Sequence, residues 1–277
     1  MMKHILTIAG SDSGGGAGIQ ADLKTITMLQ AYGASVITAV TAQNTVGVRG
    51  VYAVPLEGIA AQLDAVCQDI VFHGVKTGML ASKAVVELVS EKLRQYQLPN
   101  LVVDPVMVAT SGDMLLQMDA VEALRQQLLP CAFLVTPNLQ EAEVLAEQKI
   151  HTLDDMKTAG ARILRETGCA NVLVKGGHLA EGATDLLCMG DGQFIPFAGD
   201  RIATKNSHGT GCTLSAALAT CLGQGMALPD AVQAAKMYLT KALYYGRLDE
   251  IGHGSGPVRH NYALWEENCR ETAEGRC

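Results

Sequence analysis

Short runs of β-branched and other apolar residues alternate along the chain with stretches in which apolar residues recur every three or four positions. The runs predict β-strands, and the spacing of three and four predicts helices that bury one face. The candidate strands lie at residues 4–9, 34–40, 71–76, 101–104, 133–136 and 171–175. The run at 101–104 is apolar until its final Asp, which is typical of a strand covered on both faces.

Helical spacing fills the gaps between these strands. It is clearest in four series, and Pro55 can stand near the start of the first. The series are Leu56, Ile59, Leu63, Val66, Cys67 and Ile70; Val85, Leu88, Val89, Leu93 and Tyr96; Leu214, Ala217, Leu218, Cys221 and Leu222; and Val232, Ala235, Leu239, Ala242 and Leu243. The alternation predicts an α/β fold with a mostly parallel central sheet and helices on both faces.

The stretch 184–203 departs from the alternation. It contains two short strand patterns around Asp191-Gly192, a dipeptide typical of hairpin turns, so we expect a short antiparallel extension at the sheet edge. The sequence has no internal repeat, low-complexity block or linker. We therefore expect residues 1–265 to form a single domain and 266–277 to be a polar C-terminal tail.

Composition narrows the function classes. Hydrophobic residues make up 48% of the 277 positions, enough for a sizeable core, and the net charge is −7 with no basic stretch. This acidic balance argues against binding to a nucleic-acid backbone. No apolar run reaches the roughly 18 residues of a spanning helix, and the N-terminus lacks a signal-peptide pattern. The eight cysteines form no C-x-x-C pair, so we expect reduced thiols in a cytoplasmic protein without nucleic-acid or membrane partners.

Ligands of open α/β sheets bind outside the carboxyl ends of the strands, so the residues that follow each strand are candidate ligand-binding residues. The first such segment, from Gly10 to Gly18, is rich in glycine but has no lysine after the glycines, which excludes a P-loop. It matches a dinucleotide-binding pattern only loosely. It can also be a flexible turn, or a loop that brings substrate close to the backbone.

Two polar residues stand near the first two strand ends. Asp22 shares the apolar face of the helix that follows the glycine-rich segment. It can interact with the helix dipole or accept a hydrogen bond from a polar ligand. Gln43, after the second strand, can bind the amino and ring-nitrogen edge of a heterocycle with both groups of its amide, or it can simply be solvated.

Acidic and basic residues follow the later strands. Asp104 ends the strand at 101–104, and Glu141 lies one turn into the helix after Asn138. Two carboxylates at neighbouring strand ends suit Mg²⁺, although Glu141 can merely stabilise a helix N-terminus and Asp104 can cap a turn. Lys175 ends the next strand and is a point charge suited to phosphate.

The segment from Thr204 through Lys205 to Thr213 is the most informative. Gly209, Thr210 and Gly211 precede a helix that begins near Cys212. A glycine-rich turn at a helix N-terminus offers free backbone N–H groups to an anion. In such a place the thiolate of Cys212 would be stabilised and its pKa would fall. The alternative is a glycine-rich helix cap beside a buried cysteine.

Taken together, these blocks resemble the ribokinase-like superfamily, and within it the hydroxymethylpyrimidine/phosphomethylpyrimidine kinases of thiamine biosynthesis. The resemblance runs from about Lys3 to Trp265. The blocks that carry it are LTIAGSDSGGGAGIQADLK (6–24), TAQNT (41–45), KTGML (76–80), DPVMVATSG (104–112), TPNLQEAE (136–143), VKGGH (174–178), KNSHGTGCTLSAALA (205–219) and GHGSGP (252–257).

The resemblance implies a ribokinase-like three-layer sandwich that uses ATP and Mg²⁺, often as a homodimer. Such enzymes phosphorylate 4-amino-5-hydroxymethyl-2-methylpyrimidine to its monophosphate and then to the diphosphate. The pyrimidine would lie near Gly10, Asp22, Thr41, Gln43, Met79 and Val106. Asp104 and Glu141 would serve Mg²⁺. Asn138, Lys175, Thr204 and Lys205 would lie along the nucleotide, and Gly209, Thr210 and Gly211 would form the anion hole.

Many sugar kinases of the superfamily carry an aspartate base at the position of Cys212, whereas this chain matches the pyrimidine and pyridoxal kinase branch. Cys212 would then accept the hydroxymethyl proton late in transfer, with His208 either tuning it or facing solvent. The alternative functions are a pyridoxal or pyridoxine kinase of the same superfamily and a non-catalytic nucleotide- or pyrimidine-binding protein. A nicotinamide oxidoreductase would rest on the loose glycine pattern alone.

Overall fold

The computed structural model describes residues 1–107, 118–177 and 183–264, so the expected tail at 266–277 lies outside the described residues. Within these ranges nine strands form one sheet in the order β3-β2-β1-β4-β5-β6-β7-β8-β9. In this order the six strands from β2 to β7 pair in parallel. β3 pairs antiparallel with β2, β8 with β7, and β9 with β8. The strands are β1 (His4–Asp12), β2 (Tyr32–Asn44), β3 (Gly47–Ala53), β4 (Gly74–Thr77), β5 (Leu101–Val103), β6 (Leu134–Val135), β7 (Asn171–Val174), β8 (Asp185–Met189) and β9 (Phe194–Phe197).

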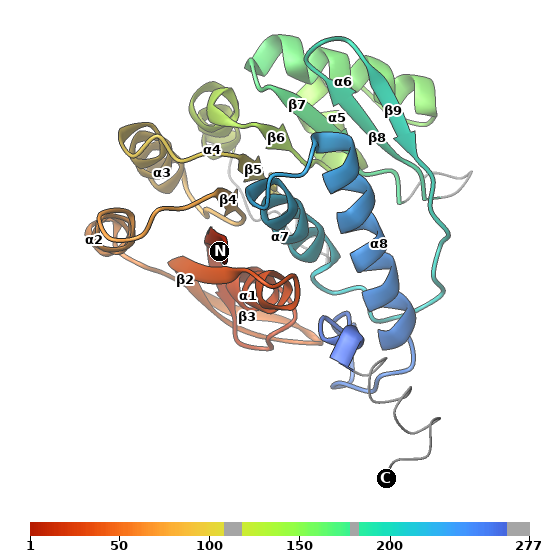
Figure 1. Cartoon of the computed structure of the whole chain (residues 1–277), viewed down its shortest axis with the longest axis horizontal. Coiled ribbons are helices and arrows are strands. Elements are labelled where there is room, and N and C mark those ends of the chain that lie inside the picture. Colours follow the sequence, from red (N-terminus) through yellow and green to blue (C-terminus); the bar gives the residue numbers. More distant parts are fainter. Residues whose placement is uncertain (108–117, 178–182, 265–277) are drawn as a thin grey trace.

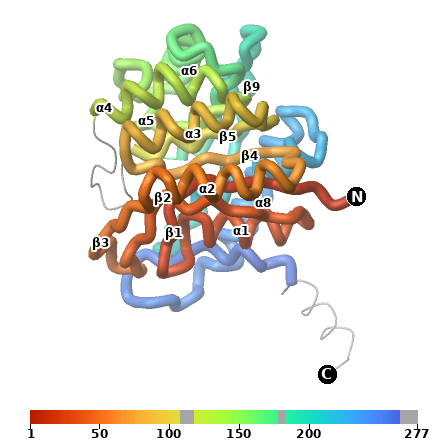
Figure 2. The backbone as a smooth tube through the Cα atoms, turned by 90° about the vertical axis from the view of Figure 1, so that its left-hand side faces the viewer, coloured from red at the N-terminus to blue at the C-terminus, as the bar shows by residue number. Residues whose placement is uncertain are grey.

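Helices cover both faces of the sheet, as Figures 1 and 2 show. One face carries α1 (Gly18–Met28), α7 (Thr210–Gly223) and α8 (Leu228–Gly246), whose apolar side chains form one hydrophobic cluster with the sheet. The other face carries α2 (Leu56–Cys67), α3 (Lys83–Gln95), α4 (Met118–Ala123), a π-helical turn η1 (Leu124–Leu128), a 3-10 turn η2 (Leu129–Cys131), α5 (Leu139–Ala146) and α6 (Leu153–Thr167). These elements share a second, larger cluster with the sheet. The α/β prediction is therefore confirmed.

Local sequence explains where several helices begin. Asn138 and Thr152 open α5 and α6 with reciprocal capping boxes, in which the cap side chain and the acidic side chain at the third helical position each satisfy a backbone N–H. Pro55 stands at the start of α2, as expected. Gly168 ends α6 in the left-handed conformation, which costs glycine no steric penalty.

The edges of the sheet confirm one prediction and add one element. The hairpin of β8 and β9 turns at Asp191-Gly192, with Gly192 at a φ of 89°. At the opposite edge β2 continues to Asn44 and pairs with β3, a strand the apolar pattern did not predict. Gln43 therefore lies on the extended end of β2 instead of in a loop after it. A register shift between Ala42 and Gln43 marks a bulge there, and bulges re-aim side chains.

In the part of the chain that the structure describes, none of the helices combines the length and the apolar character needed to cross a membrane.

Candidate active site

A cavity of about 1100 Å³ opens at the carboxyl ends of the parallel strands. It lies where the sequence analysis expects a ligand, and its wall comes from the strand ends, α5, α7 and α8. Fourteen of the sixteen candidate site residues line it: Gly10, Thr41, Gln43, Met79, Asp104, Val106, Asn138, Glu141, Lys175, Thr204, Gly209, Thr210, Gly211 and Cys212. Asp22 and Lys205 do not.

The turn before α7 forms one end of the cavity. Gly209 caps the helix at a φ of 79°, a conformation that favours glycine. A Cβ on Gly211 would lie 3.3 Å from Asp104 Oδ2 and 3.5 Å from Lys175 Nζ. The first turn of α7 thus presents its N–H groups and the positive end of the helix dipole beside these two charges.

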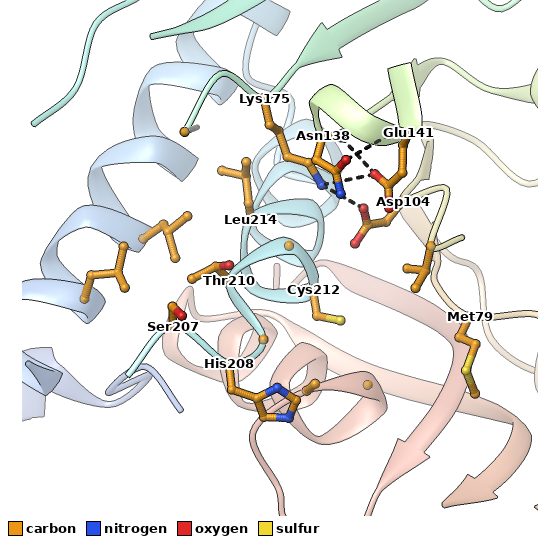
Figure 3. A pocket seen from close by; sticks show the side chains of 18 of the residues that line it. Met79, Asp104, Asn138, Glu141, Lys175, Ser207, His208, Thr210, Cys212 and Leu214 are labelled. Atoms are coloured by element: carbon orange, nitrogen blue, oxygen red, sulfur yellow. Dashed lines mark hydrogen bonds and ion pairs between the residues drawn. The ribbon is translucent and has the colours of Figure 1, made fainter. Parts of the chain in front are cut away.

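Asp104, Glu141 and Lys175 form a charged group beside this turn (Figure 3). Lys175 Nζ lies 3.1 Å from Asp104 Oδ1 and 4.0 Å from Glu141 Oε2. Both carboxylates are almost wholly buried, at 3% and 4% exposure of their side chains. Glu141 Oε2 also accepts a hydrogen bond from the Asn138 N–H, so Glu141 caps α5 and faces the cavity at the same time.

Burial and the neighbouring charges together shift the pKa values of Glu141 and Lys175. Burial raises the pKa of Glu141 to about 7, although Lys175 opposes the shift. Burial acts to lower the pKa of Lys175, but the carboxylates of Asp104 and Glu141 outweigh it and raise the pKa. The lysine therefore stays charged, and its strongest partner in the free protein is Asp104.

Cys212 lies at the first turn of α7 and points into the cavity (Figure 3). The backbone N–H of Gly18, at the start of α1, acts to lower the pKa of its thiol. The expectation of a lowered thiol pKa is wrong for this structure: burial raises the pKa of Cys212 to about 11, and the nearby ammonium of Lys76 only partly offsets this effect. The sequence indicated the helix N-terminus and, as the alternative, a buried cysteine, but it could not decide which effect on the thiol pKa is larger.

The other end of the cavity is less charged. A Cβ on Gly10 would lie 2.5 Å from Met79 Cε, so a larger residue here would require the end of the Met79 side chain to shift. The Thr41 hydroxyl donates to the Ser11 carbonyl at 2.8 Å. Val106 adds an apolar side chain, and Gln43 reaches in from the bulge of β2. A flat, mostly apolar ring with one polar edge fits this end.

Asp22 has a different place from the one expected. Its carboxylate is wholly buried within α1, 2.8 Å from Lys76 Nζ and 2.6 Å from the Thr7 hydroxyl. It neither lines the cavity nor serves a helix dipole. The burial of Lys76, which also shows no exposure, demands a carboxylate at this position because an unpaired buried ammonium is very costly.

Three residues that were expected to contact the nucleotide differ in whether their side chains can reach a ligand in the cavity. Lys205 is exposed and lies outside the cavity lining. Thr204 lines the cavity, and its hydroxyl accepts from the Asn206 N–H at 3.0 Å. The side-chain oxygen of Asn138 is occupied by the Glu141 N–H at 2.9 Å, which leaves its amide nitrogen for a ligand.

Asp12 was not among the candidates, and His208 was expected either to tune Cys212 or to face solvent. Asp12 accepts N–H groups from the glycine-rich segment, and His208 Nε2 lies 2.9 Å from Asp12 Oδ2. An Asp two positions before a glycine is a common turn-forming pattern and could have indicated Asp12. Nothing local in the sequence pairs it with a histidine 196 positions away.

Fold and site together define a kinase of the ribokinase-like class. The structure of a Bacillus subtilis pyridoxal kinase in complex with ADP superposes with a TM-score of 0.86 at 35% identity, over 96% of this chain and 100% of that one. A phosphomethylpyrimidine kinase structure from Clostridium difficile gives a TM-score of 0.79 at 44% identity, over 87% and 99%.

Sequence comparison identifies the family within this class of kinases. The phosphomethylpyrimidine kinase family profile matches residues 12–259, and the chain belongs to this family. A hydroxymethylpyrimidine/phosphomethylpyrimidine kinase of Rhizobium meliloti is 51% identical over 96% of this chain and 100% of its own length. A thiamine biosynthesis bifunctional protein of Geobacter sulfurreducens is 50% identical over 92% of this chain, which spans only 52% of that protein.

Proposed function

We propose that this chain is a kinase that transfers phosphate from ATP to 4-amino-5-hydroxymethyl-2-methylpyrimidine, and then to the resulting monophosphate, for thiamine diphosphate synthesis. The observation that carries the proposal is the layout of the one cavity. An anion-binding turn at Gly209–Gly211, with Lys175 and two carboxylates, lies at one end. Gln43, Met79 and Val106 lie at the other. Similarity to the family's hydroxymethylpyrimidine/phosphomethylpyrimidine kinases supports this choice of substrate.

The anion end suits the transferred phosphoryl group. Phosphoryl transfer depends mainly on positioning and on stabilising charge. The N–H groups of the α7 turn and the Lys175 ammonium would meet the charge on the phosphoryl oxygens. Asn138 and Thr204 also line the cavity and would contact the rest of the nucleotide.

Asp104 and Glu141 fit a magnesium ion carried by the nucleotide. Both are hard oxygen donors, and Mg²⁺ commonly uses one or two carboxylates together with water and phosphate oxygens. The described residues hold no group of three or more acidic, histidine or cysteine side chains that could bind a metal, so most ligands would come from nucleotide and water. The ion would supply neutralisation of phosphate charge.

As a thiolate, Cys212 would accept the proton of the substrate hydroxymethyl group, and its side chain lines the cavity. A general base of this kind contributes about 10²–10⁴-fold. Because burial raises the pKa of Cys212 to about 11 in the free protein, the thiol is protonated at neutral pH. It can act as a base only where bound ligands and the two helix N-termini favour the thiolate.

The direct test is mass spectrometry of the products formed from ATP, Mg²⁺ and the pyrimidine alcohol. We expect the monophosphate first and the diphosphate later. Absence of both, with an intact fold by circular dichroism, would refute the proposed function. ATP consumption that does not depend on the pyrimidine would exclude coupled transfer, and the absence of ATP consumption would favour a non-catalytic binding protein.

A pyridoxal kinase is the second candidate because such a kinase shares the fold at 35% identity. A cavity-facing thiol at Cys212 can also add reversibly to an aldehyde. Comparison of kcat/KM for the pyrimidine alcohol and for pyridoxal separates the two. We expect the pyrimidine to be preferred, because Gln43 matches an amino and ring-nitrogen edge that pyridoxal lacks.

We also propose that the chain works as a homodimer. The edge hairpin of β2 and β3 exposes apolar side chains at Val46, Val48, Val51 and Tyr52, and β3 leaves one backbone edge of the sheet unpaired. Sedimentation velocity tests this, and a monomer at micromolar concentration would refute it. The cytoplasmic location expected from the sequence stays a prediction.

A further inference from the structure

The glycine-rich segment after β1 is organised by a single carboxylate. Asp12 Oδ1 accepts the Gly14 N–H at 2.8 Å, and Oδ2 accepts the N–H groups of Gly16 and Ala17 at 3.0 and 2.8 Å. Asp12 is only 2% exposed. Burial acts to raise its pKa, but the hydrogen bonds from His208, Ala17 and Gly14 outweigh it and lower the pKa. The carboxylate is therefore ionised and can only accept hydrogen bonds.

The acceptor character of Asp12 fixes the tautomer of His208. The imidazole Nε2 lies 2.9 Å from Asp12 Oδ2. Two acceptors at this distance would repel each other, so Nε2 carries a proton and donates it to Asp12. His208 precedes the anion turn, whereas Asp12 belongs to the glycine-rich segment. This hydrogen bond therefore links two loops that both line the cavity.

The two loops also interlock sterically. A Cβ on Gly209 would lie 1.9 Å from the Gly16 carbonyl oxygen, and a Cβ on Gly16 would lie 2.6 Å from His208 Cδ2. There is no space for a methyl group on either side. The position of the anion turn thus depends on the loop that Asp12 shapes.

The proton on His208 in turn determines the orientation of the Gln43 amide. Gln43 Nε2 faces His208 Nε2 at 3.3 Å and Gln43 Oε1 faces Thr41 Oγ1 at 3.2 Å, but the two amide ends are alike in shape and the hydrogen-bond network decides their order. In this order an NH₂ group opposes the imidazole N–H, which is a second donor. The single Thr41 proton goes to the Ser11 carbonyl at 2.8 Å, so Thr41 accepts best from an NH₂ group, and the network favours the reversed amide with its oxygen toward His208.

This orientation leaves each half of the amide with one free hydrogen-bonding position. The oxygen keeps a lone pair and the NH₂ keeps one N–H, in a fixed order along the cavity wall. The backbone of Gln43 is held as well, since its N–H donates to Ser13 Oγ and its carbonyl accepts from the same hydroxyl, at 2.8 and 2.7 Å. A ligand edge that carries a donor beside an acceptor can therefore bind the Gln43 amide in one order only.

We propose that His208, held by Asp12, is a positioning residue that orients the Gln43 amide and so selects an aminopyrimidine over a ring with the reversed donor and acceptor pattern. The proposal rests on the proposed function. The 4-amino substrate offers N–H beside a ring-nitrogen acceptor, whereas the corresponding 4-oxo alcohol offers a carbonyl oxygen beside a ring N–H. Without His208 only the Thr41 contact favours this orientation, so the amide can turn over more easily and accept either ring.

The test compares the two alcohols in three variants. In the wild type we expect kcat/KM to favour the 4-amino alcohol by about ten- to hundred-fold, the range of one bidentate contact. His208→Phe keeps a ring but no donor, and most of this preference should disappear. His208→Gln restores an N–H and should restore much of it. His151→Phe changes an exposed histidine between α5 and α6 and should leave the preference unchanged.

A second measurement needs no variant and no substrate. Two-bond ¹H–¹⁵N correlation of the histidine rings should show His208 protonated at Nε2 and bare at Nδ1. An Nδ1–H tautomer would overturn the proposal, as would a preference that survives in His208→Phe or an equal loss with both alcohols, which indicates a merely structural role. If the wild type phosphorylates neither alcohol, the proposed function fails while the tautomer still tests the placement of His208.

Discussion

The buried ion pair between Lys76 and Asp22 predicts a large loss of stability when one partner is removed. Lys76 Nζ lies 2.8 Å from Asp22 Oδ2, and neither side chain is exposed. Burial acts to lower the pKa of Lys76, but the charge of Asp22 outweighs it and raises the pKa. Asp22 Oδ1 has no hydrogen-bond partner within the described ranges. The carboxylate depends on Lys76 and on the Thr7 hydroxyl alone.

Lys76→Met keeps the length and apolar stem of the side chain but removes the ammonium. The substitution leaves a carboxylate in the interior without its counter-charge, and breaking a buried pair in this way costs about 3–5 kcal/mol. For a chain of this size one kcal/mol corresponds to about 2–4 °C in Tm. We therefore expect the Tm to fall by roughly 6–20 °C.

Urea unfolding followed by circular dichroism measures this loss, and two variants control for it. Lys92→Met breaks the pair with Asp64 at 2.6 Å, which is partly exposed and should contribute far less to stability than the buried pair. Lys76→Met combined with Asp22→Leu removes both charges and should recover most of the stability. A loss below about 1 kcal/mol in Lys76→Met, or a double variant less stable than the single one, would refute the reasoning.

Three further predictions concern the cavity and its support. Cys212→Ala should lower kcat by about 10²–10⁴-fold while the KM for the pyrimidine stays nearly constant; wild-type turnover would remove the base role. Asp104→Asn should shift the Mg²⁺ titration of activity to higher concentration, and an unchanged titration would contradict the metal assignment. Burial lowers the pKa of His260 from 6.5 to about 4, so between these pH values only the unfolded chain binds the proton. Stability should therefore fall as the pH drops through this range, by about 3 kcal/mol in total. His260→Gln should lack this component in urea unfolding at pH 7 and pH 4, and an identical pH dependence in both proteins would show that His260 does not cause it.

The central strands were predictable from sequence because burial on both faces leaves a continuous apolar run. The edge strand β3 was missed for the opposite reason: Gly47, Arg49 and Gly50 interrupt its pattern, and most of its side chains are exposed. The series used for prediction also passed over α6, although its capping box at Thr152 was readable.

The site was predictable to the extent that topology alone determines it. Residues at the carboxyl ends of parallel strands meet at one edge of the sheet, which is why Asp104, Glu141 and Lys175 converge. The direction of the Cys212 pKa shift could not be predicted from the sequence, because burial raises the pKa whereas a helix N-terminus lowers it. The partner of Asp22 was equally hidden, because Lys76 is 54 positions away.

The sheet also explains why the two halves of the cavity stay in register. Gly211 comes from α7 on one face of the sheet, whereas Glu141 comes from α5 on the other, and each helix packs in its own hydrophobic cluster. Asp104, at the end of β5, and Lys175, at the end of β7, lie between them. The sheet holds α7 so close to the end of β5 that a methyl group on Gly211 would touch Asp104. The separation between the anion turn and the acidic pair is therefore a property of strand spacing, and a loop alone would not maintain it.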